Sequence, residues 1–170
     1  IIILEFGVYK GETLKLFSDK ITDPNARFYG FDTFTGLPEN WLNLKKGHFS
    51  SNGKLPDIDD ERVNYEVGLF KDTLPTFLKN FEKGSFEKKT FFIHFDADLF
   101  SSTLFVLEEI KRYIPEYYFS FDQFPSDEVR ALFAFENFND LDIEFYFKQK
   151  KDSSTPIARV FGKIKNYYKP

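Results

Sequence analysis

The first eleven residues are the feature that most constrains the fold of this chain. The apolar run Ile1–Leu4 ends at Glu5, and Gly7 and Gly11 bracket the segment before a helical pattern begins at Thr13. A buried strand, a glycine turn and a helix in this order form the place where α/β proteins bind nucleotide-like ligands. The dinucleotide fingerprint Gly-x-Gly-x-x-Gly is absent, so a plain strand-to-helix turn is the competing interpretation.

Apolar β-like runs alternate with helical stretches along most of the chain, which is typical of a parallel sheet with crossover helices. We expect strands at Ile1–Leu4, Arg27–Phe31, Asn64–Val67, Thr90–Phe95 and Tyr117–Phe121. We expect helices at Thr13–Lys20, Thr73–Phe81, Ser102–Tyr113 and Asp127–Phe138. Asp72 is the expected cap of the second helix, and Ser101 or Ser102 is the expected cap of the third.

The C-terminal part shows a different pattern. Asp142–Lys148 and Ile157–Ile164 alternate polar and apolar residues, and the polar connection Gln149–Pro156 joins them. This alternation predicts an antiparallel hairpin instead of another crossover. The expected fold is therefore a single α/β domain over residues 1–170. It has a Rossmann-like, mostly parallel seven-stranded sheet, a C-terminal antiparallel hairpin and helices on both faces.

Composition excludes several classes of site and partner. The chain has 170 residues, no cysteine and a net charge of −4, with acids and bases interspersed. Disulfides, thiolate catalysis and zinc–thiolate sites are therefore excluded, and no basic stripe indicates a nucleic-acid partner. No apolar run is long enough to span a bilayer, so we expect no membrane partner and a cytoplasmic location.

The chain contains no methionine and opens directly with a core strand. We therefore expect an upstream segment that is missing from this sequence and that would cover the site or help to build an oligomer. The sequence does not set the oligomeric state, and a homo-oligomer is compatible with it.

Acidic residues follow three of the expected strands. Asp32 follows the second strand, where an acid hydrogen-bonds ribose hydroxyls; a turn or cap aspartate is the alternative. Asp96 and Asp98 follow the fourth strand, and Asp122 and Gln123 follow the fifth. Oxygen ligands from Asp96, Asp122 and Gln123 would suit magnesium at the shared edge of the sheet. The alternative is that Asp98 caps the next helix and Asp122 is a solvated turn residue.

Two histidines and one long loop complete the candidate residues. His94 lies inside the fourth strand and is expected to be a hydrogen-bonded structural residue. His48 lies in the long loop Thr33–Asp60, which also holds Trp41, and we interpret this loop as a substrate-side lid. His48 is either a base or substrate contact, or a residue of the loop surface.

Five segments of the chain, in order, resemble one known family. They are Glu5–Val8, Gly30–Glu39, Lys46–Ser50, Gly68–Pro75 and Asp96–Thr103. Together they are similar to the macrocin O-methyltransferase family of class I S-adenosylmethionine-dependent methyltransferases. Five motifs in register are far more specific than any one of them, and the closing hairpin fits the class I fold.

The resemblance implies a class I methyltransferase fold with S-adenosylmethionine as the cofactor. It puts the methionine part at the Glu5–Gly11 turn, the ribose on Asp32 and the adenine near Gly68–Phe70. The implied partner is a small-molecule acceptor that offers a hydroxyl of a sugar or another glycoside. The candidate cofactor-binding residues are Glu5, Phe6, Gly7, Val8, Tyr9, Gly11, Thr13, Asp32, Thr33, Phe34, Gly68, Leu69, Phe70, Asp96 and Ala97.

The resemblance also implies magnesium on Asp96, Asp122 and the next residue. That next residue is usually an acid in the family but is Gln123 here, which removes one negative charge and keeps one oxygen that can coordinate a metal. Asp96, Asp98 and His48 are the candidate catalytic residues. Asp98 and His48 are the two candidates for the base.

These observations predict an S-adenosylmethionine-dependent O-methyltransferase. A non-catalytic module that binds the cofactor on the same fold is the alternative, and Gln123 is the residue that supports it. A nicotinamide-dependent oxidoreductase is a third interpretation. The missing glycine fingerprint and the terminal hairpin count against this third interpretation.

Overall fold

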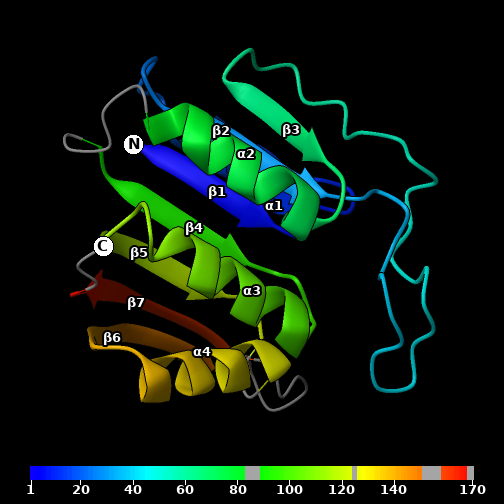
Figure 1. Ribbon diagram of the computed structural model, residues 1–170. Helices are drawn as coiled ribbons and strands as arrows, with labels where there is room; N and C mark the ends of the chain where they lie inside the picture. Colours follow the sequence, from blue (N-terminus) through cyan, green and yellow to red (C-terminus); the bar gives the residue numbers. More distant parts are fainter. Residues whose placement is uncertain (83–88, 124–125, 151–157, 168–170) are drawn as a thin grey trace.

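The computed structural model describes residues 1–82, 89–123, 126–150 and 158–167. They form one seven-stranded sheet with the strand order β3-β2-β1-β4-β5-β7-β6 (Figure 1). The strands are β1 (Ile2–Phe6), β2 (Arg27–Asp32), β3 (Val63–Val67), β4 (Phe91–Phe95), β5 (Glu116–Phe121), β6 (Leu141–Lys150) and β7 (Ala158–Asn166). The helices are α1 (Glu12–Lys20), α2 (Phe70–Glu82), α3 (Phe100–Ile110) and α4 (Asp127–Phe138).

The strand order reverses at β1, because β2 and β3 lie on one side of it and β4 and β5 on the other. These strands pair in parallel, whereas β7 is antiparallel to both β5 and β6. A reversal of this kind is where open α/β sheets bind ligands, at the carboxyl ends of the strands. The predicted sheet and its C-terminal hairpin are confirmed. Residue 157 of the predicted last strand, and residues 151–156 of the predicted connection, lie outside the described residues.

Helices cover the two faces of the sheet unequally. Apolar residues of α2, α3 and α4 pack on one face and form the larger core with the strands (Figure 1). On the opposite face, Leu14 and Phe17 of α1 pack against a smaller cluster that includes Ile3 and Phe28. All five residues of β1 are buried, as expected for a central strand between two helical layers.

A row of four phenylalanines crosses the central strands. Phe6 of β1 stacks with Phe31 of β2 and Phe95 of β4 at centroid distances of 4.7 and 6.0 Å. Phe95 in turn stacks with Phe121 of β5 at 4.8 Å. All four are buried, and the strand register places them opposite one another. The residue after each of them is the last of its strand, as Asp32 is, or the first beyond it, so the row fixes which residues stand at the carboxyl edge.

The structure corrects the expected end of the first strand. β1 continues to Phe6, so Glu5 is not at the strand tip. Glu5 lies inside the sheet opposite Gly30 on one side and His94 on the other, and it is 1% exposed. The strand continues through Glu5 because this residue pairs with β2 on one side and with β4 on the other.

The expected helix caps are also wrong. α2 begins at Phe70, because the Leu69 carbonyl accepts the Thr73 amide at 3.1 Å, and Asp72 therefore lies inside the first turn. Leu99 is the N-cap of α3, and its carbonyl accepts the Thr103 amide at 3.0 Å. Ser101 and Ser102 consequently lie in the first turn of α3, and Asp98 precedes the cap. The side chain of Ser126, which the sequence analysis did not consider, caps α4.

Gly7 follows β1 at a point where the chain leaves no room for a side chain. Its φ is +93°, and a Cβ atom there would lie 1.9 Å from the carbonyl oxygen of Asp96. The Asp96 amide donates to the Phe6 carbonyl at 2.9 Å, which joins the end of β1 to the segment after β4. Packing within the chain therefore requires a glycine at position 7, whether or not a ligand also approaches the backbone there.

We expect Gly7→Ala to lower the free energy of unfolding by about 3 kcal/mol or more, because alanine adds both a positive-φ cost and a backbone clash. Gly47→Ala is the matched control, since Gly47 has a φ of +86° but a Cβ there would meet no atom within 4 Å. That variant should lose only about 1–2 kcal/mol. Urea unfolding measures both losses, and equal losses would contradict the close packing at Gly7.

Candidate functional site

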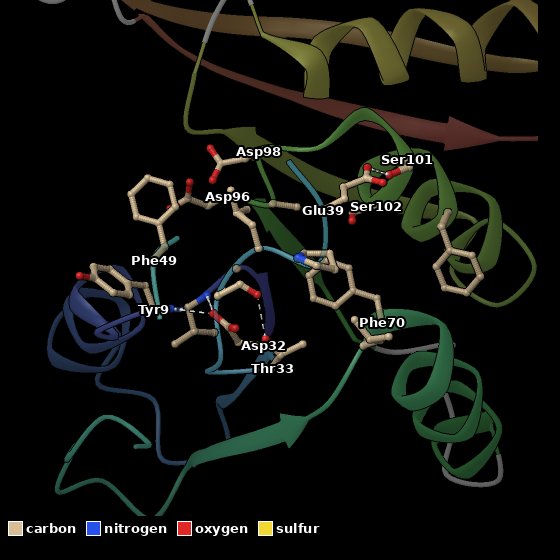
Figure 2. Close-up of a pocket in the computed structure, with 18 of the residues that line it drawn as sticks. Tyr9, Asp32, Thr33, Glu39, Phe49, Phe70, Asp96, Asp98, Ser101 and Ser102 are labelled. Carbon is tan, nitrogen blue, oxygen red and sulfur yellow. Dashed lines mark hydrogen bonds between the residues drawn. The ribbon is translucent and has the colours of Figure 1, made fainter. Parts of the chain in front are cut away.

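A cavity of about 520 Å³ lies at the carboxyl ends of the central strands. It has the size and the place of a small-molecule site in an α/β protein. Its walls come from the turn after β1, the ends of β2 and β3, the segments after β4 and β5, the start of α3 and the long loop after β2 (Figure 2). The acidic residues that line it are Asp32, Glu39, Asp96, Asp98 and Asp122, whereas Lys71 is the basic residue among the described lining.

Asp32 holds the turn after β1 in place. Its Oδ2 accepts the backbone N–H groups of Val8 and Tyr9, both at 2.8 Å, and its Oδ1 accepts that of Phe34 at 2.8 Å. A carboxylate offers about four acceptor positions, so three amides leave roughly one for a ligand hydroxyl. Asp32 is thus a turn aspartate, and it still faces the cavity (Figure 2).

The long loop after β2 forms one wall of the cavity. Leu37, Glu39 and Phe49 line it, and the Ser101 hydroxyl of α3 donates to Glu39 Oε1 at 2.8 Å (Figure 2). Trp41 Nε1 donates to Asp127 of α4 at 3.2 Å. These two bonds attach the loop to the helices on the far side of the cavity. The loop therefore forms a fixed wall of the cavity, and its role as a substrate-side lid stays a prediction.

Carboxyl groups crowd the segment after β4. Burial, followed by the charges of Asp122 and Asp98, raises the pKa of Asp96 to about 7. Burial and the charge of Asp122 raise the pKa of Asp98 to about 6. Burial also raises the pKa of Glu5 well above its usual value, with Asp96 as the next cause, and Glu5 Oε2 has no hydrogen-bond partner among the described residues. The site therefore favours a cationic ligand.

Glu128 of α4 is a site residue that the sequence analysis missed. Its Oε1 accepts the Ala97 amide at 2.7 Å and the Asp98 amide at 3.2 Å, and it is 1% exposed. Burial raises the pKa of Glu128 well above its usual value. Through these two bonds Glu128 fixes the segment in which Asp98 has a φ of +60°. The available signal was periodicity, because Glu128 shares the buried helix face with Ala131, Leu132 and Phe135.

Asp122 pairs with a cation from the hairpin. Asp122 Oδ1 accepts from Arg159 Nε at 2.8 Å and lies 2.7 Å from Arg159 Nη2. His94, Asp96 and Asp122 each offer one atom that could bind a metal, and these atoms lie within 4.8 Å of one another. His94 is buried and its Nδ1 is 2.7 Å from the Ser120 hydroxyl, as expected of a structural histidine, but its Nε2 has no hydrogen-bond partner among the described residues. Burial lowers the pKa of His94 to about 4.

A magnesium ion at this donor set would compete with a cation that is already there. Such a cation takes several oxygen ligands, usually with carboxylates among them. Here Asp122 is already paired with Arg159, Gln123 adds only a neutral amide, and His94 would supply nitrogen, which suits other metals better. The magnesium site on Asp96, Asp122 and Gln123 therefore stays a prediction that this geometry does not support.

The structure brings most of the predicted site residues to one cavity, and the others lie beside or beneath it. Glu5, Phe6 and Phe34 are buried in the core below the cavity, and His48 is exposed on the loop with its ring 4.4 Å from that of Phe49. Gly11 and Thr13 lie at the start of α1 and do not line the cavity. The predicted residues that line it are Gly7, Val8, Tyr9, Asp32, Thr33, Gly68, Leu69, Phe70, Asp96, Ala97, Asp98, Asp122 and Gln123.

Comparison with solved structures identifies the fold. CalS11, a TDP-rhamnose 3′-O-methyltransferase of calicheamicin biosynthesis, matches with a TM-score of 0.56 and 20% identity over 99% of this chain and 72% of its own. The O-methyltransferase NovP matches at 0.55 and 20%, over 94% and 70%. An O-methyltransferase from Bacillus cereus in complex with SAH matches at 0.57 and 14%, over 97% and 74%. At these identities the likeness shows the fold, which is that of the class I methyltransferases.

Searches by sequence add nothing to this result. No family model matches the chain, and no curated protein matches it either. Within the part of the chain that the structure describes, no helix is both long and apolar enough to cross a membrane. The expected cytoplasmic location stays a prediction.

Proposed function

We propose that this protein binds S-adenosylmethionine and transfers its methyl group to a hydroxyl of a small-molecule acceptor. The observation that carries the proposal is the acid-lined cavity at the reversal point of a class I methyltransferase sheet. S-adenosylmethionine carries a positive sulfonium, which an acidic cavity attracts. Among similar structures, the one from Bacillus cereus holds SAH and TomG from Streptomyces achromogenes holds SAM.

The lining residues fit the parts of this cofactor. Its methionine part would lie against Gly7–Tyr9, and its adenine against Gly68–Phe70, because these segments form two walls of the cavity. Asp32 stands between them and would accept one ribose hydroxyl with the acceptor position that its three backbone bonds leave free. Glu5, Phe6 and Phe34 would support these walls from below instead of touching the cofactor.

Asp98 is the residue that we assign to the removal of the hydroxyl proton. When bound, the cofactor supplies an electrophilic methyl group, and the protein must align the acceptor oxygen with it and take up the proton. Asp98 lines the cavity and is held by Glu128, whereas His48 lies outside the lining. Asp96 lies beside Asp98 and faces the same space (Figure 2).

The acceptor class that we propose is a sugar or another glycoside. One matched structure supports it, because CalS11 is a TDP-rhamnose 3′-O-methyltransferase; NovP supports only the transfer to a hydroxyl oxygen, as an O-methyltransferase. The loop wall would contact the acceptor through Leu37 and Glu39, because Glu39 is bonded to Ser101 of α3 across the cavity, whereas Phe49 packs edge to face on Tyr9 with ring centroids 5.8 Å apart. Membership of the macrocin O-methyltransferase family stays part of the proposal.

Two other functions are less well supported by the cavity. A nicotinamide dinucleotide carries an anionic pyrophosphate, which the cluster of Asp32, Asp96, Asp98 and Asp122 would repel. A non-catalytic cofactor-binding module would have the same fold and the same cofactor walls. Only an assay of methyl transfer to an acceptor distinguishes that module from an enzyme.

Calorimetry with S-adenosylhomocysteine tests the cofactor site. We expect one-to-one binding, and we expect NADH not to bind. The 2′-deoxy and 3′-deoxy analogues of S-adenosylhomocysteine test the contact with Asp32 and leave the protein unchanged. At least one should bind about 10- to 100-fold more weakly, since a hydrogen bond to a charged group is lost. A folded protein that binds no S-adenosylhomocysteine would refute the proposal, and equal affinities of all three ligands would refute the ribose contact.

Methyl transfer from radiolabelled S-adenosylmethionine to a panel of glycosides and catechols tests the role of Asp98. We expect Asp98→Asn to lower kcat by about 10²- to 10⁴-fold without changing the affinity for S-adenosylhomocysteine. Asparagine tolerates the positive φ of this position, so the backbone is preserved. His48→Gln is the control and should keep its activity. The opposite pattern would assign the base to His48.

A further inference from the structure

Arg159 is a cation that comes from the hairpin to the cluster at the carboxyl edge of the sheet. It lies in β7, antiparallel to β5, and reaches Asp122 directly after β5 with two of its nitrogens, at 2.8 and 2.7 Å. We propose that Arg159 takes the place of a divalent metal ion at Asp122, so that the protein works without a metal. This proposal rests on the methyl transfer proposed above for the same site.

The geometry of the pair favours this assignment. The side chain of Asp122 is 22% exposed and that of Arg159 is 42% exposed, so solvent screens the pair only in part. Arginine stays charged at all physiological pH values and presents a planar set of donors that suits a carboxylate. A divalent cation bound to Asp122 would lie within a few ångströms of this guanidinium and would be repelled by it.

The neighbouring groups do not compensate for that repulsion. Gln123 is neutral, so among the described residues Asp96 and the imidazole of His94 are the groups with an atom close enough to share a metal with Asp122. Asp98 and Glu5 act on Asp122 through their charge. The groups that could share one metal thus combine two carboxylates and one imidazole with the guanidinium of Arg159. Their charge is already partly balanced before any ion from solution arrives.

The role that follows for Arg159 is that of a positioning residue. Asp122 lines the cavity, whereas Arg159 does not. Arg159 therefore acts through Asp122: it orients the carboxylate and offsets its charge. A metal ion in this place would contact the acceptor oxygens directly, which the guanidinium does not do from its position behind Asp122.

Binding of Mn²⁺, a paramagnetic stand-in for Mg²⁺, tests the proposal without an acceptor. The loss of the free-ion signal in electron paramagnetic resonance measures the affinity of the full chain. We expect no saturable site in the unaltered protein. Arg159→Met should bind Mn²⁺ at least about tenfold more tightly than the residual, unsaturated binding of the unaltered protein, and Arg159→Met combined with Gln123→Asp should bind it more tightly still, with one ion per chain.

Lys163→Met is the matched control, because Lys163 is also in β7 and pairs with an acid of β5, Glu116, at 2.7 Å. It removes the same charge from the same strand and should not create a Mn²⁺ site. Thermal unfolding and calorimetry with S-adenosylhomocysteine show that each variant is folded.

Two results would overturn the proposal. The first is tight one-to-one Mn²⁺ binding by the unaltered protein that is lost in Asp122→Asn. The second is a lack of Mn²⁺ binding by the folded double variant, because Arg159 would then not be what keeps a cation out. A protein that binds no S-adenosylhomocysteine would instead refute the proposed function, and the Mn²⁺ titration would still report on Arg159.

Discussion

The stacked row of Phe6, Phe31, Phe95 and Phe121 is the constraint on which the site depends. The four rings lock the register of β1, β2, β4 and β5. The next residue along each strand is therefore delivered to the same edge, and these residues are Gly7, Asp32, Asp96 and Asp122. A slip of one residue in β2, β4 or β5 would turn an aspartate into the place of a core ring, because side chains alternate between the faces of a sheet. The aromatic core and the acidic edge therefore both follow from the register of these four strands.

Contacts from distant segments then give this edge its particular character. Asp32 collects three backbone amides and shapes the turn after β1, Glu128 of α4 holds the segment that carries Asp98, and Arg159 of β7 pairs with Asp122. In all three cases a charged side chain holds another segment or side chain of the site in position. The cavity that results is acidic, which favours a cationic cofactor over an anionic dinucleotide.

The sequence was sufficient to predict the sheet, its hairpin and the acids that follow the strands, because buried parallel strands read as apolar runs that end at polar residues. It placed Glu5 at the edge, whereas the structure shows it inside β1, since an apolar run can contain a buried acid. The contacts of Glu128 and Arg159 could not be predicted. They join residues 31 and 37 positions apart, and a single sequence carries no local signal for such a pairing.

The central claim is that the acid-lined cavity is an S-adenosylmethionine site. A crystal structure of the protein grown with S-adenosylhomocysteine tests it most directly. We expect density for the ligand inside the cavity, with its amino acid part against Gly7–Tyr9, a ribose hydroxyl on Asp32 and its adenine against Gly68–Phe70. A ligand bound elsewhere on the protein, with this cavity free of it, would contradict the account.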